Sequence, residues 1–582
     1  MASTVGGAVG ASSASTTVGA SILSATSLVT TGCPSGAAGI TDFGALLPGA
    51  SVTSSADCAV TFGSSNNTSM LLIRQADGWG DALWRTGNGP AFAGYAADGR
   101  YESTFGMYSH ANAATSGGDG TYLAGFTGSP PRTSIVKLGR SGVPVAGWGT
   151  GGIATVDVAG AASDQGHDVV VGDDGAVFVA GWWEPVPGTQ APYVARLLAN
   201  GTLDPAFGTG GITTLAAHTG TQGRIGLAVD AGGRPVGCWR RSNGTSIAFR
   251  LTTSGVLDSS WGAAGVATLT APAPWDSLEA VACRFDGTGR LVVAGKAIES
   301  TGDYSQWWAA RLDATGALDV GFDGDGHAIV TVGTTGAGER NQVHALGFSP
   351  TGQLVLTGQV AGSGPYDFGA ARFTGAGALD NSYDTDGLAT VDTNTGSNEW
   401  SSRGAVLPTG QVVGVVSDGR AFRLAADGAR DTTFGTAGTV TFAGFTELQT
   451  AHLAQDGRIM VHGIAQVAGQ DEFAASAIDG VAIADYDDAA GDDWATPSAA
   501  HFGACLRTVG AGATAAWTTG ACGTTDGVSW NDVPATSDKI ADGASGNAAG
   551  TVGIRFGMRM APAQSPGRYS APVVFEVTAP SA

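Results

Sequence analysis

Five aspartates crowd the stretch DYDDAAGDDW, residues 485–494, and carboxylates at this density could bind calcium, which prefers oxygen ligands. The sequence favours a solvated acidic turn, and a calcium ion at a domain junction is the alternative. Fragments at residues 322–327 and 383–387 also resemble a calcium loop, but both lack its distal Glu. We expect no other cofactor. The candidate calcium ligands are Asp485, Asp487, Asp488 and Asp492.

Aromatic rings beside carboxylates form a second candidate site, because a sugar stacks its apolar face on a ring and hydrogen-bonds its hydroxyls to acids. Such residues occur in the connections 182–193, 271–279, 296–308 and 359–367, which we expect on one face of the fold. The alternative is that some of the rings only pack between units. The candidate glycan-binding residues are Trp182, Trp183, Trp275, Asp276, Asp303, Tyr304, Tyr366 and Asp367.

The eight histidines are scattered, and the sequence has no HExxH, GxSxG or P-loop motif. His167 and His344 both lie eight residues before a turn glycine, and we interpret them as polar residues that line a wet channel. A polysaccharide-degrading enzyme would need two asymmetric acids in glycosidase geometry, which a sequence does not reveal. We therefore predict no catalytic residues and no enzymatic activity.

Six cysteines, an even number without a CxxC pair, favour two or three disulfides in an exported protein over a zinc site. Free buried thiols are the alternative. The residues after Met1 have neither the basic nor the apolar region of a signal peptide, so export requires that a signal was already removed. The candidate disulfide cysteines are Cys33, Cys58, Cys238, Cys283, Cys505 and Cys522.

The composition excludes two classes of partner. A formal net charge of −22 leaves no basic stripe to neutralise phosphates, so we expect no nucleic acid. No apolar run is long enough for a transmembrane helix. Alternating β-branched residues between Gly, Asn and Asp turns predict an all-β chain.

A repeated phrase must position these candidate residues. RLLANGTLDPAFGTGGITTL, residues 196–215, recurs with small changes, and each copy follows a turn glycine and a strand, as in GTGRLVVAG. The spacing of roughly 50–60 residues predicts an array of supersecondary units. The repeated aromatics are Trp148, Phe207, Trp261, Phe322, Tyr383, Phe434 and Tyr486, and the turn glycines are Gly120, Gly175, Gly233, Gly289, Gly352, Gly410 and Gly457.

Each unit reads as four short strands, and seven such units predict a seven-bladed β-propeller, with a β-solenoid as the alternative. The last unit lacks a fourth strand. Residues 74–96 form a degraded copy of the phrase around Trp84, so we expect residues 90–96 to supply the missing outer strand and to remove an open edge.

The charged residues of the phrase are predicted to hold each unit together, since a residue repeated in every unit serves the unit. An Asp before a tight turn accepts backbone N–H bonds. The repeated arginines are expected to pair with acids or carbonyls between units. The aspartates are Asp204, Asp258, Asp319, Asp380 and Asp431, and the arginines are Arg196, Arg250, Arg311, Arg372 and Arg423.

The phrase resembles the delta-sixty repeat of bacterial exported proteins, in which an Arg-Leu strand, a DG turn and LD are followed by two residues and FG. Five copies match well, and the resemblance covers roughly residues 94–490. Val145 stands where the other copies have Asp. The resemblance implies a propeller-like array and no particular activity.

The two flanks of the repeated region differ from it in sequence pattern. The stretches DFGALLPGASVTSSADCAVTF and PGRYSAPVVFEVT resemble strands of the immunoglobulin-like sandwiches of bacterial and archaeal surface fibres, such as pilin-like subunits. Together they predict one split sandwich with the propeller inserted, because close termini tolerate insertion. The expected segments are an N-terminal arm at 1–33, the first sandwich part at 34–88, the propeller at 89–486 and the second sandwich part at 487–582.

We therefore predict a secreted structural subunit of an extracellular, pilus-like filament. The arm of one subunit would add as a strand to the next, and such a head-to-tail contact between copies yields a filament. The alternative for the arm is a lead followed by the sandwich's own first strand. The alternative function is a monomeric cell-surface adhesin or lectin whose propeller binds glycans. The candidate arm residues are Val18, Ala20, Ile22, Leu23 and Leu28.

Overall fold

The chain folds into β-strands, with no helix among the residues that the computed structural model describes. It divides into two compact units, which are Met1–Gly87 with Gln455–Arg458 and Gly480–Ala582, and Asn88–Ala454 with Ile459–Asp479. The described residues are 3–8, 26–31, 40–46, 51–53, 58–64, 69–75, 83–85, 100–103, 105, 107–117, 120–139, 142–172, 174–216, 218–219, 223–299, 304–333, 341–361, 366–392, 403–407, 410–454, 458–478, 482–485, 501–523, 530–531, 538–543, 550–559 and 567–579.

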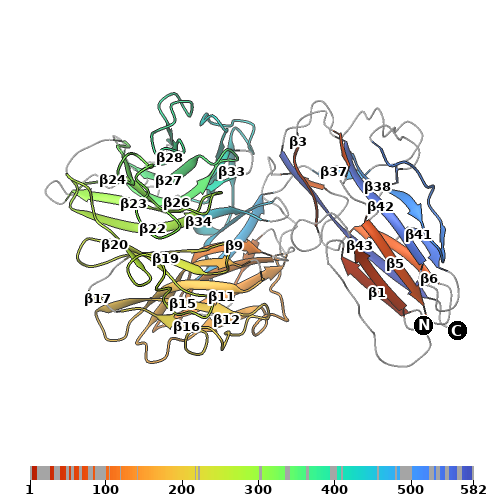
Figure 1. Ribbon diagram of the computed structural model, residues 1–582, viewed down its shortest axis with the longest axis horizontal. Coiled ribbons are helices and arrows are strands. Elements are labelled where there is room, and N and C mark those ends of the chain that lie inside the picture. Colours follow the sequence, from red (N-terminus) through yellow and green to blue (C-terminus); the bar gives the residue numbers. More distant parts are fainter. Residues whose placement is uncertain are drawn as a thin grey trace. The chain divides into compact units, whose positions relative to one another are not determined.

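The second unit consists of seven antiparallel sheets, mostly of four strands, in the described part of the chain (Figure 1). Each sheet is a meander of strands that follow one another in sequence. The sheets are β9 (Ser109–Gly117), β10 (Gly120–Thr127), β11 (Arg132–Gly139) and β12 (Ile153–Val156); β13 (Asp164–Val171), β14 (Val177–Trp183), β15 (Thr189–Leu197), β16 (Ile212–Thr214) and β17 (His218–Thr219); β18 (Ile225–Val229), β19 (Pro235–Arg240), β20 (Ser246–Arg250) and β21 (Val266–Leu269); β22 (Ser277–Phe285), β23 (Leu291–Glu299), β24 (Tyr304–Leu312) and β25 (His327–Val330); β26 (Gln342–Phe348), β27 (Leu354–Val360), β28 (Asp367–Phe373) and β29 (Leu388–Val391); β30 (Ala405–Val406), β31 (Val412–Val416), β32 (Arg420–Leu424) and β33 (Thr439–Thr441); and β34 (Phe445–Leu453), β35 (Ile459–Val467), β36 (Gln470–Ile478) and β8 (Arg100–Glu102).

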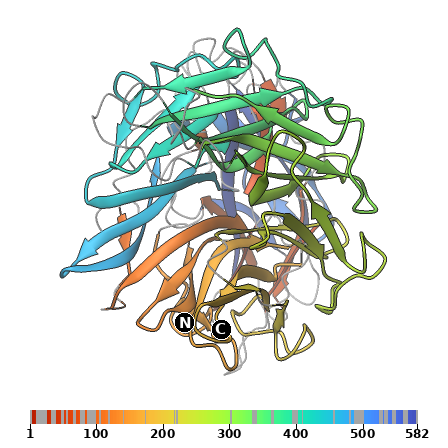
Figure 2. The same ribbon diagram turned by 90° about the vertical axis from the view of Figure 1, so that its left-hand side faces the viewer.

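The sheets close into a propeller-like ring. The first strands of successive sheets contact one another in cyclic order, from β9 through β13, β18, β22, β26 and β30 to β34, and β34 returns to β9. Figure 2 looks onto the ring, in which the sheets follow the sequence around a centre. The first strands therefore form the inner wall, and the fourth strands lie outside.

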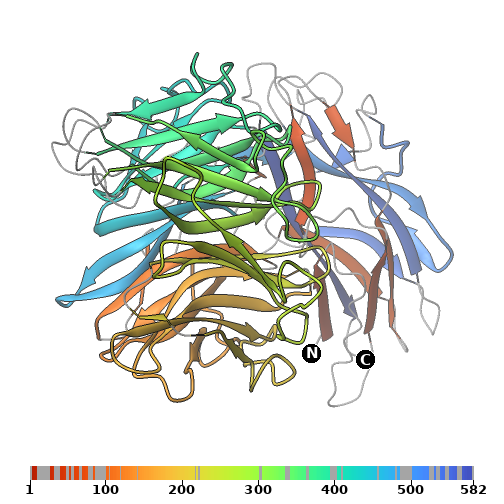
Figure 3. The same ribbon diagram turned by 60° about the vertical axis from the view of Figure 1, so that its left-hand side comes forward.

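Apolar clusters between neighbouring sheets hold the ring together. One cluster joins the sheet β18–β21 to the sheet β22–β25. It contains Val236 and Trp261 from the first segment and Val293 and Trp308 from the second. Six of the seven repeated aromatics are at most 2% exposed, and Tyr486 lies outside the described residues. Figure 3 shows neighbouring sheets packed face to face. Each repeated aromatic thus fills the space that one sheet alone could not bury.

The predicted turn role of the repeated aspartates is confirmed, whereas the repeated arginines pair with aspartates of their own unit, and Arg311 and Arg372 also donate to a carbonyl of the next. Arg372 Nε donates to Asp380 Oδ2 at 2.8 Å, and Asp380 Oδ1 accepts the backbone N–H of Ser382 at 3.1 Å. The guanidinium lies over the Tyr383 ring and also donates to the Ala426 carbonyl of the next sheet at 2.5 Å. The other four Arg–Asp pairs form in the same way.

A strand from before the first sheet closes the ring, but it lies later than predicted. β8 (Arg100–Glu102) pairs antiparallel with β36, so the expectation for residues 90–96 is wrong by a few residues. Trp84 lies in β7 (Leu83–Arg85), which pairs in the first unit with β37 and β43. The degraded phrase around Trp84 therefore belongs to the other unit, and the closing strand RYE carries no repeat pattern.

The first unit contains a sheet of fourteen strands in the described part of the chain. Ten of them follow the order β2-β5-β42-β38-β37-β7-β43-β6-β41-β39. The other four pair with members of this row, β1 and β3 with β43, β4 with β42, and β40 with β38. Its strands are β1 (Ser3–Ala8), β2 (Thr26–Thr31), β3 (Ile40–Leu46), β4 (Ser51–Thr53), β5 (Cys58–Ser64), β6 (Ser69–Gln75), β7 (Leu83–Arg85), β37 (Ala482–Asp485), β38 (His501–Val509), β39 (Ala513–Ala515), β40 (Trp530–Asn531), β41 (Asp538–Gly543), β42 (Gly550–Arg559) and β43 (Gly567–Ala579). Cys505 and Cys522, both predicted to form disulfides, are bonded to each other.

The predicted arm needs a correction. Leu28 lies in β2, which pairs antiparallel with β5 of its own chain, as the alternative reading expected. Val18, Ala20, Ile22 and Leu23 lie outside the described residues. An earlier segment, β1, pairs with β43 at the end of the chain.

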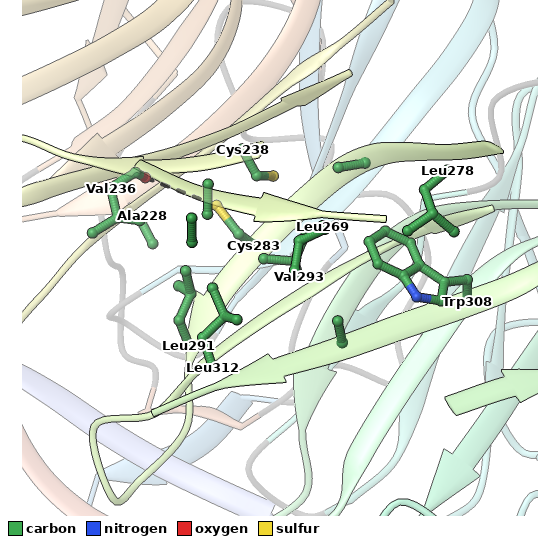
Figure 4. Packing of buried hydrophobic residues seen from close by; sticks show 14 of the residues in the cluster. Ala228, Val236, Cys238, Leu269, Leu278, Cys283, Leu291, Val293, Trp308 and Leu312 are labelled. Carbon is green, nitrogen blue, oxygen red and sulfur yellow. Dashed lines mark hydrogen bonds between the residues drawn. The ribbon is translucent and has the colours of Figure 1, made fainter. Parts of the chain in front are cut away.

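Cys238 and Cys283 are free, which corrects their predicted disulfides. Both thiols are buried in the apolar cluster that joins two sheets, and the Cys283 thiol donates to the Val236 carbonyl at 3.8 Å (Figure 4). Burial raises the pKa of the Cys283 thiol, so the protonated form is favoured. Cys33 and the side chain of Cys58 lie outside the described residues.

Candidate functional site

Two adjoining pockets occupy the centre of the ring. The larger one, about 450 Å³, is lined by residues from six of the seven sheets. The smaller one, about 140 Å³, shares Val281, His344 and Arg403 with it. We call the smaller one the arginine pocket, and its lining consists of Arg224, Val281, Gln342, Val343, His344, Gln359 and Arg403.

Bulges in the inner strands aim side chains into this centre. The pairing of β26 with β27 skips from Val343 to Ala345, so His344 is the extra residue of a β-bulge. Opposite it, Gly358 allows a close approach of the chains, because a Cβ atom there would lie 2.0 Å from the Gln342 carbonyl oxygen. Four other inner strands have the same bulge and the same facing glycine. Their bulged residues are Asn112, His167, Val281 and Gln449.

The two arginines of the pocket lie just before inner strands, Arg224 before β18 and Arg403 before β30. Neither forms a salt bridge with any residue that the structure describes. Arg403 Nη1 donates to the Asn112 carbonyl at 3.1 Å, while its buried Nε has no hydrogen-bond partner. Burial and the nearby charge of Arg224 lower the pKa of Arg403 to about 9. Burial also lowers the pKa of Arg224. Glu447 and Asp168 favour the charge of Arg224, and Asp168 favours that of Arg403, but burial has the larger effect on both guanidinium groups.

Among the described histidines, His344 is the one that lines both pockets of the centre. No hydrogen bond to its ring occurs within the described part of the chain, and it lines both pockets. Burial, and then the charges of Arg224 and Arg403, lower its pKa well below the usual value, so the ring is neutral at pH 7. His344 therefore presents an uncharged base beside two cations.

The remaining polar groups of the centre are engaged in holding sheets together. Asn112 Nδ2 donates to the Gly166 carbonyl at 2.7 Å, and Gln449 Nε2 approaches His110 Nε2 at 3.1 Å. The ring of His167 meets the edge of Trp182. The prediction that His167 and His344 line a channel therefore holds for His344, which lines both pockets, whereas His167 packs on a neighbouring ring.

Asp168 is the acid of the larger pocket. Its Oδ2 accepts the backbone N–H of Leu227 at 2.8 Å, and its Oδ1 accepts that of Val169 at 3.0 Å. Burial raises its pKa, while Arg403 and Arg284 act in the opposite direction. Both oxygens are thus committed to backbone donors, one of them in the next sheet, and Asp168 is a structural link.

The predicted aromatic face is brought together only in part. Trp275 and Tyr304 meet edge to face, with ring centroids 5.5 Å apart. Trp275 also packs on the apolar cluster of its sheet, and Trp182 on the cluster of another. Trp183 packs on a third cluster, Asp276 lies just before β22, Tyr366 lies just before β28, Asp367 begins β28, and Asp303 lies outside the described residues. The aromatic candidates therefore serve packing as well as exposing ring surface.

The predicted calcium ligands fall mostly outside the described residues, which include Asp485 at the end of β37 but not Asp487, Asp488 or Asp492. Among the described side chains, no group of three or more His, Cys, Asp or Glu residues could hold a metal ion. Among the residues that the structure describes, no helix is long and apolar enough to cross a membrane.

The sequence carried a signal for the arginine pocket that the prediction missed. Arg403 lies seven residues before its turn glycine, where four other units have Ala or Gly and the remaining two have Asp168 and Thr450. Arg224 lies nine residues before the turn glycine of its unit. At this position five of the other units have Ala, Gly, Val or Leu, and one has Ser. Charged residues that break the repeat at inner-strand positions mark the site.

Comparison with known proteins supports the ring architecture. Residues 173–207 match a family described as a domain of unknown function (DUF5122) beta-propeller. No curated protein sequence matches the chain. Similar solved structures include a gluconolactonase from Xanthomonas campestris, with 14% identity, TM-score 0.29, and coverage of 52% of this chain and 90% of that one.

Two further similar structures are the polysaccharide lyase Uly1 and a PL25 ulvan lyase bound to -[GlcA(1-4)Rha3S]-. Uly1 has 10% identity and a TM-score of 0.39, and the match covers 70% of this chain and 98% of that one. The ulvan lyase has 10% identity and a TM-score of 0.37, and the match covers 70% and 96%. At these identities and TM-scores the likeness assigns no activity to this chain.

All three of these proteins are enzymes, and this finding contradicts the prediction that the chain has no enzymatic activity. That prediction rested on missing linear motifs. A ring of sheets gathers its central side chains from separate units, so a site there leaves no linear motif. The prediction of no enzyme is therefore withdrawn.

Proposed function

We propose that the chain is a seven-bladed β-propeller, inserted in a split immunoglobulin-like sandwich, that binds an acidic saccharide at its centre. The carrying observation is the arginine pocket, where Arg224 and Arg403 lie together without a salt bridge to any described residue. A bound carboxylate would accept charge-assisted hydrogen bonds from both guanidinium groups and would offset their mutual repulsion. Small concave sites with few convergent polar groups are typical of ligand binding.

The ligand class follows from the surroundings. The pocket is small enough to enclose one carboxylate or sulfate group, and the larger pocket next to it offers room for the rest of the molecule. Two guanidinium groups at the pocket suit a sugar ring that carries an acid, such as a uronate.

Calorimetric titration with short oligomers of galacturonate, glucuronate and mannuronate tests this proposal, with uncharged gluco-oligomers as the matched ligand. We expect saturable binding of an acidic oligomer only. Arg403→Gln and Arg224→Gln should each weaken it by ~10–100-fold, since a hydrogen bond to a charged group contributes ~1.5–3 kcal/mol. Arg420→Gln, on the outer hairpin where Arg420 pairs with Asp418, is the control and should change nothing.

Two results would overturn the proposal. The first is the absence of binding by all three acidic oligomers. The second is binding that survives both pocket substitutions.

The filament subunit remains a second candidate because of one observation. The strand β43 pairs along one edge with β6 and along the other with β1, which lies at the start of the chain. A terminal strand that completes a sheet edge could instead be donated to another copy outside the cell. Electron microscopy of the full chain and of a chain that lacks residues 1–8 separates the cases. Filaments that need these residues support donation, and single particles in both samples contradict it.

A further inference from the structure

Two histidines of the last sheet meet at the interface that closes the ring, and neither of them lines the arginine pocket. His452 lies on β34 and His462 on β35, and their ring centroids are 5.7 Å apart. The register pairs His452 with Met460 and His462 with Thr450, so both rings lie on one face of the sheet. Met460, on the same face, packs in the apolar cluster between the last sheet and the first.

His462 is buried without the partners that a polar ring requires. The residue is 0% exposed, and neither ring nitrogen has a hydrogen-bond partner within the part of the chain that the structure describes. Burial, and then the charges of His452 and Arg403, hold its pKa well below the usual value, so the ring is neutral at pH 7. A buried polar group without a partner costs folding free energy, so its presence here points to a bound species.

The contact that His452 makes with the first sheet suits the ring of a metal ligand. His452 Nε2 contacts Ser116 Oγ at 2.7 Å, and Ser116 Oγ contacts Thr121 Oγ1 at 3.1 Å. When Nε2 donates its hydrogen bond to Ser116, the lone pair lies on Nδ1. Metal-binding histidines typically donate their other N–H in this way, which fixes the tautomer. With metal–nitrogen distances of ~2 Å, two rings on one ion have centroids at most ~6 Å apart, so the observed 5.7 Å fits a shared ion.

We propose that His452 and His462 bind one monovalent copper ion, with the thioether of Met460 as the third ligand. Imidazole and thioether groups are donors that Cu(I) accepts, and this soft ion needs only two or three ligands. Zinc usually takes three or four protein ligands, and no group of three or more His, Cys, Asp or Glu side chains among the described residues could hold it. The cation Arg403 acts on His462, and it disfavours a divalent ion more than a monovalent one.

The larger pocket gives the ion a route to this site. His452 and Ser116 both belong to its lining, so an ion at the centre of the ring meets this ligand before the fully buried His462. The inference does not depend on the proposed function, because the arginine pocket contributes none of the ligands.

Titration of the full chain with Cu(I) tests the proposal, with ascorbate to keep the ion reduced, oxygen excluded and bicinchoninate as the competing chelator. We expect one bound ion with nitrogen ligands in its X-ray absorption spectrum. His462→Leu should weaken binding by at least ~100-fold, beyond the ~10–100-fold loss typical of a residue that only orients a ligand. Because leucine removes a buried ring without partners and adds no polar group, this variant should fold. His327→Gln is the matched control, since His327 is also buried but accepts a hydrogen bond from Trp308.

The free thiols of Cys238 and Cys283 are the competing ligands, because Cu(I) also binds thiolates. A Cys238→Ala, Cys283→Ala protein should keep the nitrogen-bound ion, and copper should raise its unfolding temperature. Copper binding that this protein loses, or that His462→Leu retains in full, would overturn the proposal, and so would the absence of binding. A rise in unfolding temperature that zinc causes and His462→Leu abolishes would overturn the choice of copper.

Discussion

Replacing Arg403 by Gln should make the ligand-free propeller more stable. Burial and the charge of Arg224 lower the pKa of Arg403 from its usual value to about 9, so the fold disfavours the charged guanidinium. At 1.36 kcal/mol per pKa unit, the upper bound of this cost is ~5 kcal/mol. The substitution also loses the hydrogen bond to the Asn112 carbonyl, which contributes ~1 kcal/mol, and the attraction to Asp168. We expect a net gain of ~1–3 kcal/mol.

The assay is chemical denaturation of both proteins at several pH values. Because the folded-state pKa of Arg403 is lowered to about 9, the unfolded chain binds more protons between about pH 9 and the usual pKa of an arginine. The original protein should therefore gain stability relative to Arg403→Gln as the pH rises through this window, and the difference should be largest below it. The charged and titratable groups that act on Arg403 are Arg224, Arg284 and Asp168, with His344 beside it in the pocket.

A double-mutant cycle with Arg224→Gln tests the cause directly. If the two guanidinium groups repel each other, either substitution relieves most of the strain, and the second adds less than it does alone. Stability changes that add fully, or an Arg403→Gln protein that is less stable than the original at pH 7, would refute the reasoning.

Three other substitutions test the fold. Trp261→Ala removes a side chain that is 2% exposed between two sheets, and we expect a loss of ~3–5 kcal/mol in unfolding free energy by denaturation; a loss under ~1 kcal/mol would contradict that packing. Tyr101→Pro removes a ladder donor from β8, so the ring should open at its closure and limited proteolysis should cut there, at a cost of ~3 kcal/mol; unchanged protease resistance would argue against closure by β8. Ellman's reagent should fail to reach Cys238 and Cys283 in the native protein and should titrate them in denaturant; a Cys238→Ala, Cys283→Ala protein that shows the same increase would contradict their burial.

The repeated parts of the fold were predictable because each unit needs the same physical solution. A buried aromatic, an Arg–Asp pair and a turn glycine recur wherever a meander must pack on its neighbour, as Phe322, Arg311 and Asp319 do. Gly289 and Gly352, predicted at turns, have φ angles of 83° and 80°, which suit glycine. Such local requirements leave a periodic trace in the sequence.

Closure left no such trace, and the bulges left periodic glycines whose role the sequence does not reveal. β8 is three residues long, and its place depends on the free edge of β36, which lies more than 350 residues away in the chain. The bulge glycines, such as Gly358, stand in the same strands as the predicted pattern, but their purpose is visible only when the facing carbonyl is placed. A contact between distant segments is a property of the ring and not of any one window of sequence.

The arginine pocket depends both on the repeated sequence pattern and on contacts between distant segments of the chain. Residues that stabilise a repeated unit are expected in every copy, so a charge that occurs at an inner-strand position in one copy has another cause. Arg224 and Arg403 meet this condition, and the fold holds them together although burial and mutual repulsion oppose their charge. Strain kept at a position where most of the other units have small or apolar residues is strain that a ligand can relieve. The departures from the repeat therefore point to the same residues as the electrostatics, and this agreement supports a binding site at the centre of the ring.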